Sequence, residues 1–96
     1  MRVRFSSEAR AKLRAIHAYL AAEAPQHADA LIDRLTRRAE LIGNFPYSGR
    51  TVPEYRQESV REVLERPYRI IYRIKADEVE IATVMHCRQL LPEDLA

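Results

Sequence analysis

The 96-residue sequence contains a single cysteine, Cys87. One cysteine excludes an intramolecular disulfide and a cysteine-rich zinc site. No stretch approaches the roughly 18 uninterrupted apolar residues that a membrane-spanning helix needs. The N-terminus has neither an apolar signal core nor a small-residue cleavage pattern, so we expect a cytoplasmic protein.

Lysine is also scarce, because Lys12 and Lys75 stand against fourteen arginines. Arginine suits bidentate pairing with carboxylates or phosphates better than diffuse attraction. Residues 1–50 hold nine basic and five acidic side chains, and residues 51–96 hold seven and nine, so neither half is a basic block. The charge permits nucleic-acid binding without requiring it, and a solvated, salt-bridged surface explains it equally well.

The overall composition is that of one small globular domain. Apolar residues make up 47% of the chain and charged residues 31%, which is too apolar for a disordered protein. A chain of this length fits one core, and two cores would each be too small to bury enough surface. We therefore assign residues 1–96 to a single domain.

The first half of the chain predicts a strand and two helices. Period-two alternation over residues 2–5 indicates a short strand. A capping serine and helical apolar spacing then predict a helix that extends to about Ala22. Pro25 begins a second helix, which ends at Gly43. Few residues separate the two helices, so we expect an antiparallel helical hairpin.

The second half predicts a loop and a sheet. Residues 47–58 are rich in glycine, proline, serine, threonine and charge, and a loop of this length suggests use in binding. Residues 60–65, 68–75 and 79–86 are rich in β-branched and aromatic side chains and predict a three-stranded antiparallel meander. The fold class is therefore α+β, with the helices packed on one face of the sheet.

Strict alternation predicts which residues of the last strand share a face. One face carries Val79, Ile81, Thr83 and Met85. The other carries Glu80, Ala82, Val84 and His86.

Five motifs follow one another along nearly the whole chain. They are Val3-Arg4-Phe5-Ser6 before Ala9, Phe45-Pro46-Tyr47-Ser48-Gly49-Arg50, Val60-Arg61-Glu62, Pro67-Tyr68-Arg69-Ile70-Ile71-Tyr72-Arg73, and Val84-Met85-His86-Cys87-Arg88. In this order they resemble the RelE/ParE family of bacterial toxins from type II toxin-antitoxin systems. The Asn-Phe-Pro-x-x-Gly-Arg loop and the His-x-Arg ending look closest to the ParE branch. Cys87 departs from that branch, where glycine or alanine usually follows the histidine.

The resemblance implies a compact α+β toxin that a cognate antitoxin, of ribbon-helix-helix or similar type and encoded beside it, neutralises by wrapping a segment over it. For the ParE branch the implied target is DNA gyrase, inhibited through binding. For the RelE branch the toxin is an endoribonuclease that cuts ribosome-bound mRNA. A third alternative is an interaction module without toxicity. Fold alone does not choose between these.

Cleaving RNA without a metal requires a base, an acid and cations that stabilise the transition state. Glu62 or His86 could supply the acid-base group. The lysine cluster of RelE-type enzymes is absent, and Cys87 stands where a YoeB-like enzyme has the tyrosine of its late His-Tyr pair. We therefore expect no catalytic residue and no sequence-specific nucleic-acid binding by the chain alone. The residues we assign to target or antitoxin binding are Arg61, Arg69, Arg73, His86 and Arg88.

The apolar helix stripes exceed what a small sheet can cover, so we expect a groove in which an amphipathic antitoxin segment docks. Its predicted lining is Leu13, Ile16, Leu20, Leu31 and Leu35. The sequence indicates no cofactor and no metal site.

Overall fold

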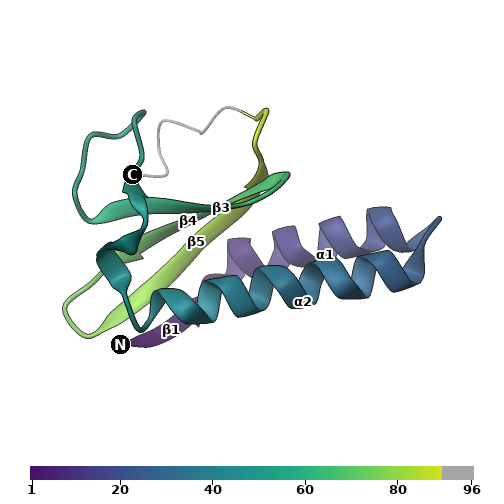
Figure 1. Cartoon of the computed structure of the whole chain (residues 1–96), viewed down its shortest axis with the longest axis horizontal. Helices are drawn as coiled ribbons and strands as arrows, with labels where there is room; N and C mark the ends of the chain where they lie inside the picture. Colours follow the sequence, from purple (N-terminus) through teal and green to yellow (C-terminus); the bar gives the residue numbers. More distant parts are fainter. Residues whose placement is uncertain (90–96) are drawn as a thin grey trace.

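Five strands form one sheet in the order β1-β5-β4-β3-β2, and two antiparallel helices pack against one of its faces (Figure 1). The computed structural model describes residues 1–89. The elements are β1 (Arg2–Phe5), α1 (Ser7–Ala21), α2 (Pro25–Ile42), a 3₁₀ turn (Pro46–Ser48), β2 (Arg50–Thr51), β3 (Val60–Glu65), β4 (Tyr68–Ile74) and β5 (Glu78–His86). This arrangement confirms the predicted α+β fold.

The start of α1 is tied to the sheet by one serine. Ser6 is the N-cap residue, and its Oγ accepts a hydrogen bond from the backbone N–H of Ala9 at 3.0 Å. The same hydroxyl donates to the carbonyl of Ala82 on β5 at 2.7 Å. Because Ser6 follows β1, which pairs in parallel with β5, the cap also fixes where the helix leaves the sheet.

A β-bulge on β5 overturns the strict alternation expected for that strand. Ile71 of β4 pairs with Thr83 and the next residue, Tyr72, pairs with Ile81, which leaves Ala82 without a partner on β4. One extra residue reverses the side-chain pattern beyond it. Ile81 therefore faces the helices, whereas Met85 packs on the opposite face.

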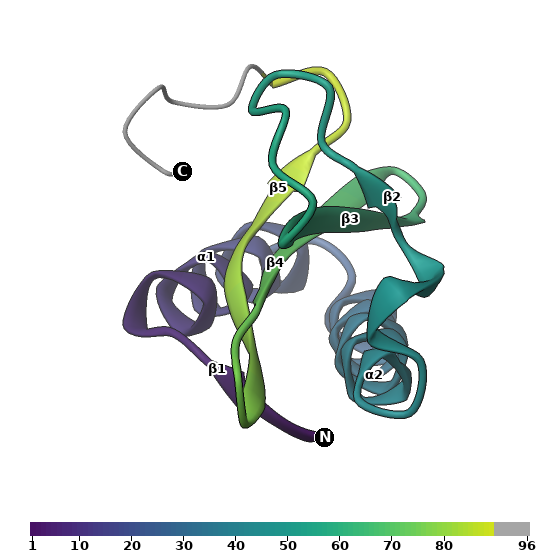
Figure 2. The same ribbon diagram turned by 90° about the vertical axis from the view of Figure 1, so that its left-hand side faces the viewer.

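Two apolar clusters lie on the two faces of the sheet. The larger one joins both helices to the sheet and includes Leu35, Ile42, Ile70, Tyr72 and Ile81, each no more than 1% exposed. Figure 2 shows the hairpin on this side, with α1 beside β5 and α2 beneath the β2 end.

The segment after the 3₁₀ turn covers the other face. A smaller cluster there combines Val52, Val60, Ile71 and Met85, with Tyr55 packed against it. The predicted loop therefore contains the short strand β2, which pairs antiparallel with β3. No helix among residues 1–89 is both long and apolar enough to cross a membrane.

Candidate functional site

The pleat of the sheet divides the predicted binding residues between its two faces. Across the β4–β5 pair, Tyr68 lies opposite His86 and Arg69 lies opposite Met85. Successive residues of a strand point to opposite faces, so Arg69 and His86 lie on opposite sides of the sheet. Arg61 is likewise separated from Arg69, because the residue beside it, Glu62, binds Arg69. The structure does not bring the five predicted residues together on one surface.

Arg69 lies in a buried network of charges on the face opposite the helices. Its Nε donates to Oε1 of Glu62 at 2.6 Å, and its terminal nitrogens lie 3.3 Å from a carboxylate oxygen of Glu54. Arg50 from β2 donates to the other oxygen of Glu62, whose side chain is fully buried. Only 7% of Arg69 is exposed, so its guanidinium is occupied within the chain.

The pKa values of this network reflect burial opposed by pairing. Burial lowers the pKa of Arg69, but hydrogen bonds to Glu62 and Glu54 outweigh it and raise the pKa above its ordinary value. Burial raises the pKa of Glu54, but a backbone hydrogen bond and Arg69 outweigh it and lower the pKa. Both groups are therefore held in their charged forms. The network joins β2, β3 and β4 to the loop that carries Glu54.

Arg61 holds the loop that precedes β2. Its Nη1 donates to the carbonyl of Gly49 at 2.9 Å and to that of Tyr47 at 3.3 Å, and its Nε donates to the carbonyl of Glu58 at 2.8 Å. The guanidinium also lies 4.9 Å from the centre of the Tyr47 ring, which is a cation–π distance. Among residues 1–89, the contacts of the Arg61 guanidinium are therefore backbone carbonyls and the Tyr47 ring, and it forms no ion pair with a carboxylate.

Arg73 belongs to a chain of ion pairs that ties β1, β4 and β5. Its Nη1 lies 3.1 Å from Glu80, which also accepts from Arg4 at 2.7 Å. Arg4 further donates to Glu78 at 2.9 Å. Burial raises the pKa of Glu80, but the hydrogen bonds from Arg4 and Arg73 outweigh it and lower the pKa. Arg73 is thus half-buried and paired, and it supports the position of β1.

His86 and Arg88 lie together at the end of β5. The His86 ring meets Tyr68 edge to face, with 5.7 Å between ring centres and 76° between ring planes. Its Nδ1 accepts from the backbone N–H of Arg88 at 3.1 Å, so the proton of the neutral ring belongs on Nε2. The Nδ1 lone pair is therefore occupied by a backbone contact within the turn that follows β5.

Beside His86 lies a groove of about 280 Å³ between α1 and the end of the sheet. Its walls include Ala15, Ile16 and Tyr19 from α1 and Tyr68 and His86 from the sheet. Tyr19 is 80% exposed, which is unusual for a large aromatic side chain on a helix.

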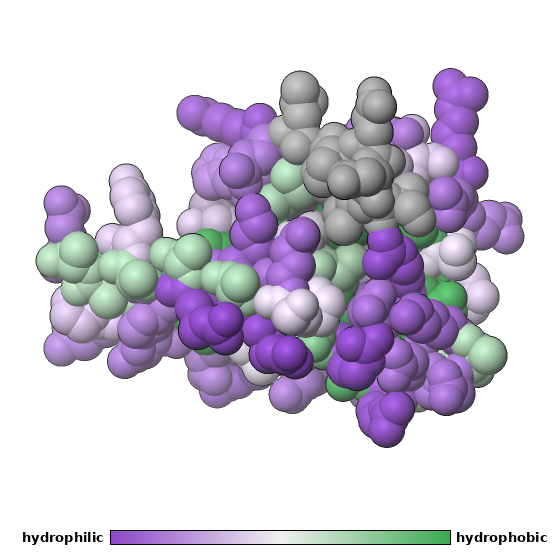
Figure 3. Space-filling view, turned by 180° about the vertical axis from the view of Figure 1, so that it is seen from behind, coloured by the Kyte–Doolittle hydropathy of each residue, from purple (hydrophilic) through white to green (hydrophobic). Residues whose placement is uncertain are grey.

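The other predicted groove residues divide between the surface and the core. Leu20 and Leu31 line a second hollow of about 370 Å³ that also contacts Tyr68. Leu13 lines a smaller hollow between the helices. Leu35 is 1% exposed in the core, which corrects the expectation that it lines an open groove. Figure 3 shows pale-green, mildly hydrophobic residues gathered over the projecting end of the hairpin.

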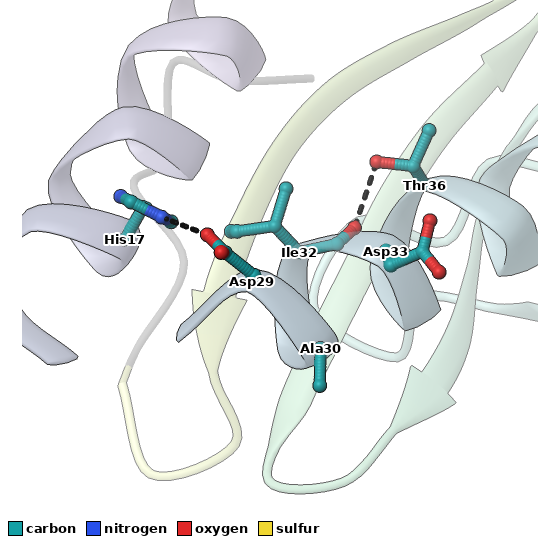
Figure 4. Close-up of a pocket in the computed structure, with 6 residues that line it drawn as sticks. All are labelled: His17, Asp29, Ala30, Ile32, Asp33 and Thr36. Carbon is teal, nitrogen blue, oxygen red and sulfur yellow. Dashed lines mark hydrogen bonds and ion pairs between the residues drawn. The ribbon is translucent and has the colours of Figure 1, made fainter. Parts of the chain in front are cut away.

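A polar pair spans the two helices on the outer side of the hairpin (Figure 4). His17 Nε2 of α1 lies 2.7 Å from Asp29 Oδ1 of α2, at the edge of a hollow of about 590 Å³. Asp33 and Thr36 line the same hollow, and the Thr36 hydroxyl donates to the carbonyl of Ile32 at 2.8 Å. Within residues 1–89, no three His, Cys, Asp or Glu side chains lie close enough together to hold a metal ion.

The family model of the ParE toxin of the type II toxin-antitoxin system parDE matches residues 3–91. The chain belongs to the ParE toxin family. A protein described as "Putative toxin Y4kP" from Sinorhizobium fredii (strain NBRC 101917 / NGR234) is 36% identical over 96 residues, which cover 98% of this chain and 96% of that protein.

Two solved toxin-antitoxin systems share the fold. A chain of the chromosomal ParDE system of P. aeruginosa superimposes with a TM-score of 0.76 and 22% identity, covering 90% of this chain and 95% of that one. A chain of the RelBE2 complex of Mycobacterium tuberculosis gives a TM-score of 0.62 and 23% identity, covering 88% of each. The architecture of this ParE-family toxin is thus common to ParDE and RelBE systems.

Proposed function

We propose that this ParE-family toxin stops growth by binding a protein target, DNA gyrase, and performs no chemistry of its own. The observation that carries the proposal is the separation of two candidate groups for RNA cleavage, Arg69 and His86, on the two faces of the sheet. Arg69 is buried against Glu62 on one face of the sheet, and His86 lies on the other face with its Nδ1 occupied. A general base and a stabilising cation must both reach the same phosphate, and these two cannot.

The proposal includes a cognate antitoxin. The groove between α1 and the sheet end offers Ile16 and Tyr19 to an amphipathic segment, and Lys12 lies on its border. An apolar stripe of a partner segment with acidic flanks would fit this chemistry. Both structural neighbours come from toxin-antitoxin systems, which supports a partner of this kind.

The experiment compares two activities of the purified chain. We expect inhibition of supercoiling by DNA gyrase, with accumulation of broken DNA, and no cleavage of mRNA on translating ribosomes. Cleavage of ribosome-bound mRNA with unaffected supercoiling would overturn the proposal in favour of an endoribonuclease. Unrestricted growth of antitoxin-free cells that express the chain would overturn toxicity itself.

Antitoxin docking is tested separately by Tyr19→Ala. We expect this variant to arrest growth as the wild type does, but to require more of the adjacently encoded antitoxin for rescue. Leu64→Ala is the matched control, because Leu64 is an exposed apolar residue on β3, outside the groove. Equal rescue of both variants would contradict docking in this groove.

A further inference from the structure

The loop between α2 and β2 presents two large aromatic side chains to solvent. Phe45 is 70% exposed and Tyr47 is 64% exposed. Leu41, at the end of α2, is 54% exposed. Met1 lies at the same end of the molecule, because its amino group donates to the carbonyl of Gly43 at 2.7 Å, and it is 53% exposed. Four of the six large apolar residues that are exposed among residues 1–89 therefore gather at the end of α2.

The backbone beneath these side chains is fixed from the core. The hydroxyl of Tyr72, a residue with no exposed surface, donates to the carbonyl of Pro46 at 2.6 Å and accepts from the N–H of Gly49 at 3.1 Å. A Cβ at position 49 would collide with this hydroxyl and would lie 2.6 Å from the carbonyl of Glu62. Only glycine allows so close an approach, so the loop is pressed against the sheet.

A fixed backbone that carries exposed aromatic rings is typical of a binding surface. A loop that only connected two elements would gain solubility from polar tips and would lose nothing by moving. Here the hydrogen bonds of Arg61 and Tyr72 hold the segment, while its apolar side chains remain in water. Rigid aromatic side chains lose little conformational entropy on binding, which is why they dominate the energy of protein interfaces.

The charges around the loop indicate the kind of partner. Arg38 and Arg61 form no ion pair with a carboxylate among residues 1–89, although seven other arginines do so. Both guanidiniums lie close enough to the Tyr72 hydroxyl to lower its pKa, although burial has the larger effect and raises it overall. Arg61 lies against the Tyr47 ring, and Arg38 lies near the Tyr72 hydroxyl that holds the loop, so the positive charge beside the exposed rings complements an apolar pocket bordered by carboxylates.

A single-stranded nucleic acid fits this surface less well. Such a strand requires a track of free cations along its phosphates. The arginines of β1, β2 and β4 are instead paired with glutamates, and the exposed apolar residues at this end of the molecule include Met1 and Leu41.

We propose that Phe45 and Tyr47 are the residues by which this toxin grips its protein target, inserting into an apolar pocket bordered by carboxylates, with Arg38 and Arg61 facing those carboxylates. This inference rests on the proposed function, because it assumes that the chain acts by binding a protein. It places target binding at the end of α2, away from the groove beside α1, so one chain has separate surfaces for target and antitoxin.

The test expresses Phe45→Ala/Tyr47→Ala in antitoxin-free cells and assays the purified variant against DNA gyrase holoenzyme. We expect about a 30-fold loss of potency in both assays, the size typical of removing dominant interface residues. Leu64→Ala is the control, because it removes an exposed apolar side chain on β3, outside both the loop and the groove, and should retain full potency. Thermal unfolding checks that the double variant remains folded. Arg38→Glu should also lose potency, and Arg14→Glu, an exposed arginine of α1, should not.

Each outcome has a defined meaning. A folded double variant that arrests growth and inhibits gyrase as the wild type does overturns this inference and leaves the proposed function intact. A wild type that arrests growth without affecting gyrase overturns gyrase as the target, and the growth assay alone then decides the inference. A wild type without any effect overturns both. Fluorescence anisotropy of a fluorescein-labelled single-stranded DNA tests the nucleic-acid alternative. If the wild type binds this DNA and the double variant does not, a protein partner is overturned in favour of nucleic acid.

Discussion

Neutralising one buried carboxylate, with Glu62→Gln, perturbs the charge network at its centre. Both oxygens of Glu62 accept from guanidiniums, one from Arg69 and one from Arg50, and its side chain has no exposed surface. The substitution keeps the shape of the side chain and removes its charge. Arg69 then remains buried with only Glu54 to pair with, and the Glu54 side chain is 37% exposed.

The expected cost follows from burial. Removing one partner of a buried ion pair typically costs about 3–5 kcal/mol, and the remaining contact with Glu54 places this case near 3 kcal/mol. For a domain of this size that loss lowers the melting temperature by about 15 °C. Differential scanning calorimetry of the purified chain measures the change.

Two further variants test whether the loss of stability comes from the buried charge of Arg69. Glu65→Gln, three residues further along β3 and on its other face, breaks an exposed pair with Arg34 at 3.4 Å and should cost less than about 1 kcal/mol. The double variant Glu62→Leu/Arg69→Met removes both buried charges and should recover much of the lost stability. Equal losses for Glu62→Gln and Glu65→Gln, or a double variant as unstable as the single one, would refute the account of Arg69 as a structural brace.

Three further predictions concern the supports of the fold. Tyr72→Phe should cost about 1–3 kcal/mol, because it leaves the buried N–H of Gly49 and the partly buried carbonyl of Pro46 without their partner. Hydrogen exchange should then show faster exchange of the Gly49 amide, and unchanged exchange would contradict the fixed loop. Ser6→Ala should cost about 1–2 kcal/mol in chemical denaturation, since it removes both the helix cap and the hydrogen bond to Ala82, whereas a loss no larger than that of Ser7→Ala would count against this double role. The hydrogen bond from Arg4 lowers the pKa of Glu78 below its ordinary value of 4.5. The stability that the Glu78 carboxylate contributes is therefore complete above pH 4.5 and is lost as the pH falls through the folded-state pKa. A Glu78→Gln variant with the same acid sensitivity as the wild type would refute this linkage.

Local patterns sufficed for the two helices and for strands β1, β3, β4 and β5. Helix α2 begins at Pro25, as the missing N–H and fixed backbone angle of proline predict, and β3 spans the six residues that β-branched content marked. These features depend on neighbours in the chain. The two helices were expected to pack on one face of the sheet for the same reason, because their apolar stripes are visible in the sequence.

Features that depend on distant residues could not be read in this way. The bulge at Ala82 follows from the pairing of β5 with β4, and nothing in the sequence of β5 marks it. Strand β2 has only two residues and forms because Arg50 meets Glu62 twelve positions later. The separation of Arg69 from His86 is an arithmetic result of register, which one misplaced residue would reverse.

The two residues proposed to bind the target were also only partly predictable from the sequence. Phe45 and Tyr47 belong to one of the motifs on which the family resemblance rests. Their exposure to solvent is visible only in the three-dimensional structure. The signal available in the sequence was the combination of two aromatic residues with proline and glycine in a loop too long for a simple connection.

We propose that this ParE-family toxin acts by binding a protein and not by catalysis. The most direct measurement titrates the purified chain into a fixed amount of DNA gyrase and follows supercoiling at several incubation times. A binding inhibitor should reach full inhibition near equimolar toxin, at a level that does not deepen with time. Supercoiling that persists at a large molar excess of toxin would contradict binding to gyrase. Turnover of a substrate by the toxin at trace concentrations, such as cleavage of mRNA on ribosomes, would contradict the absence of catalysis.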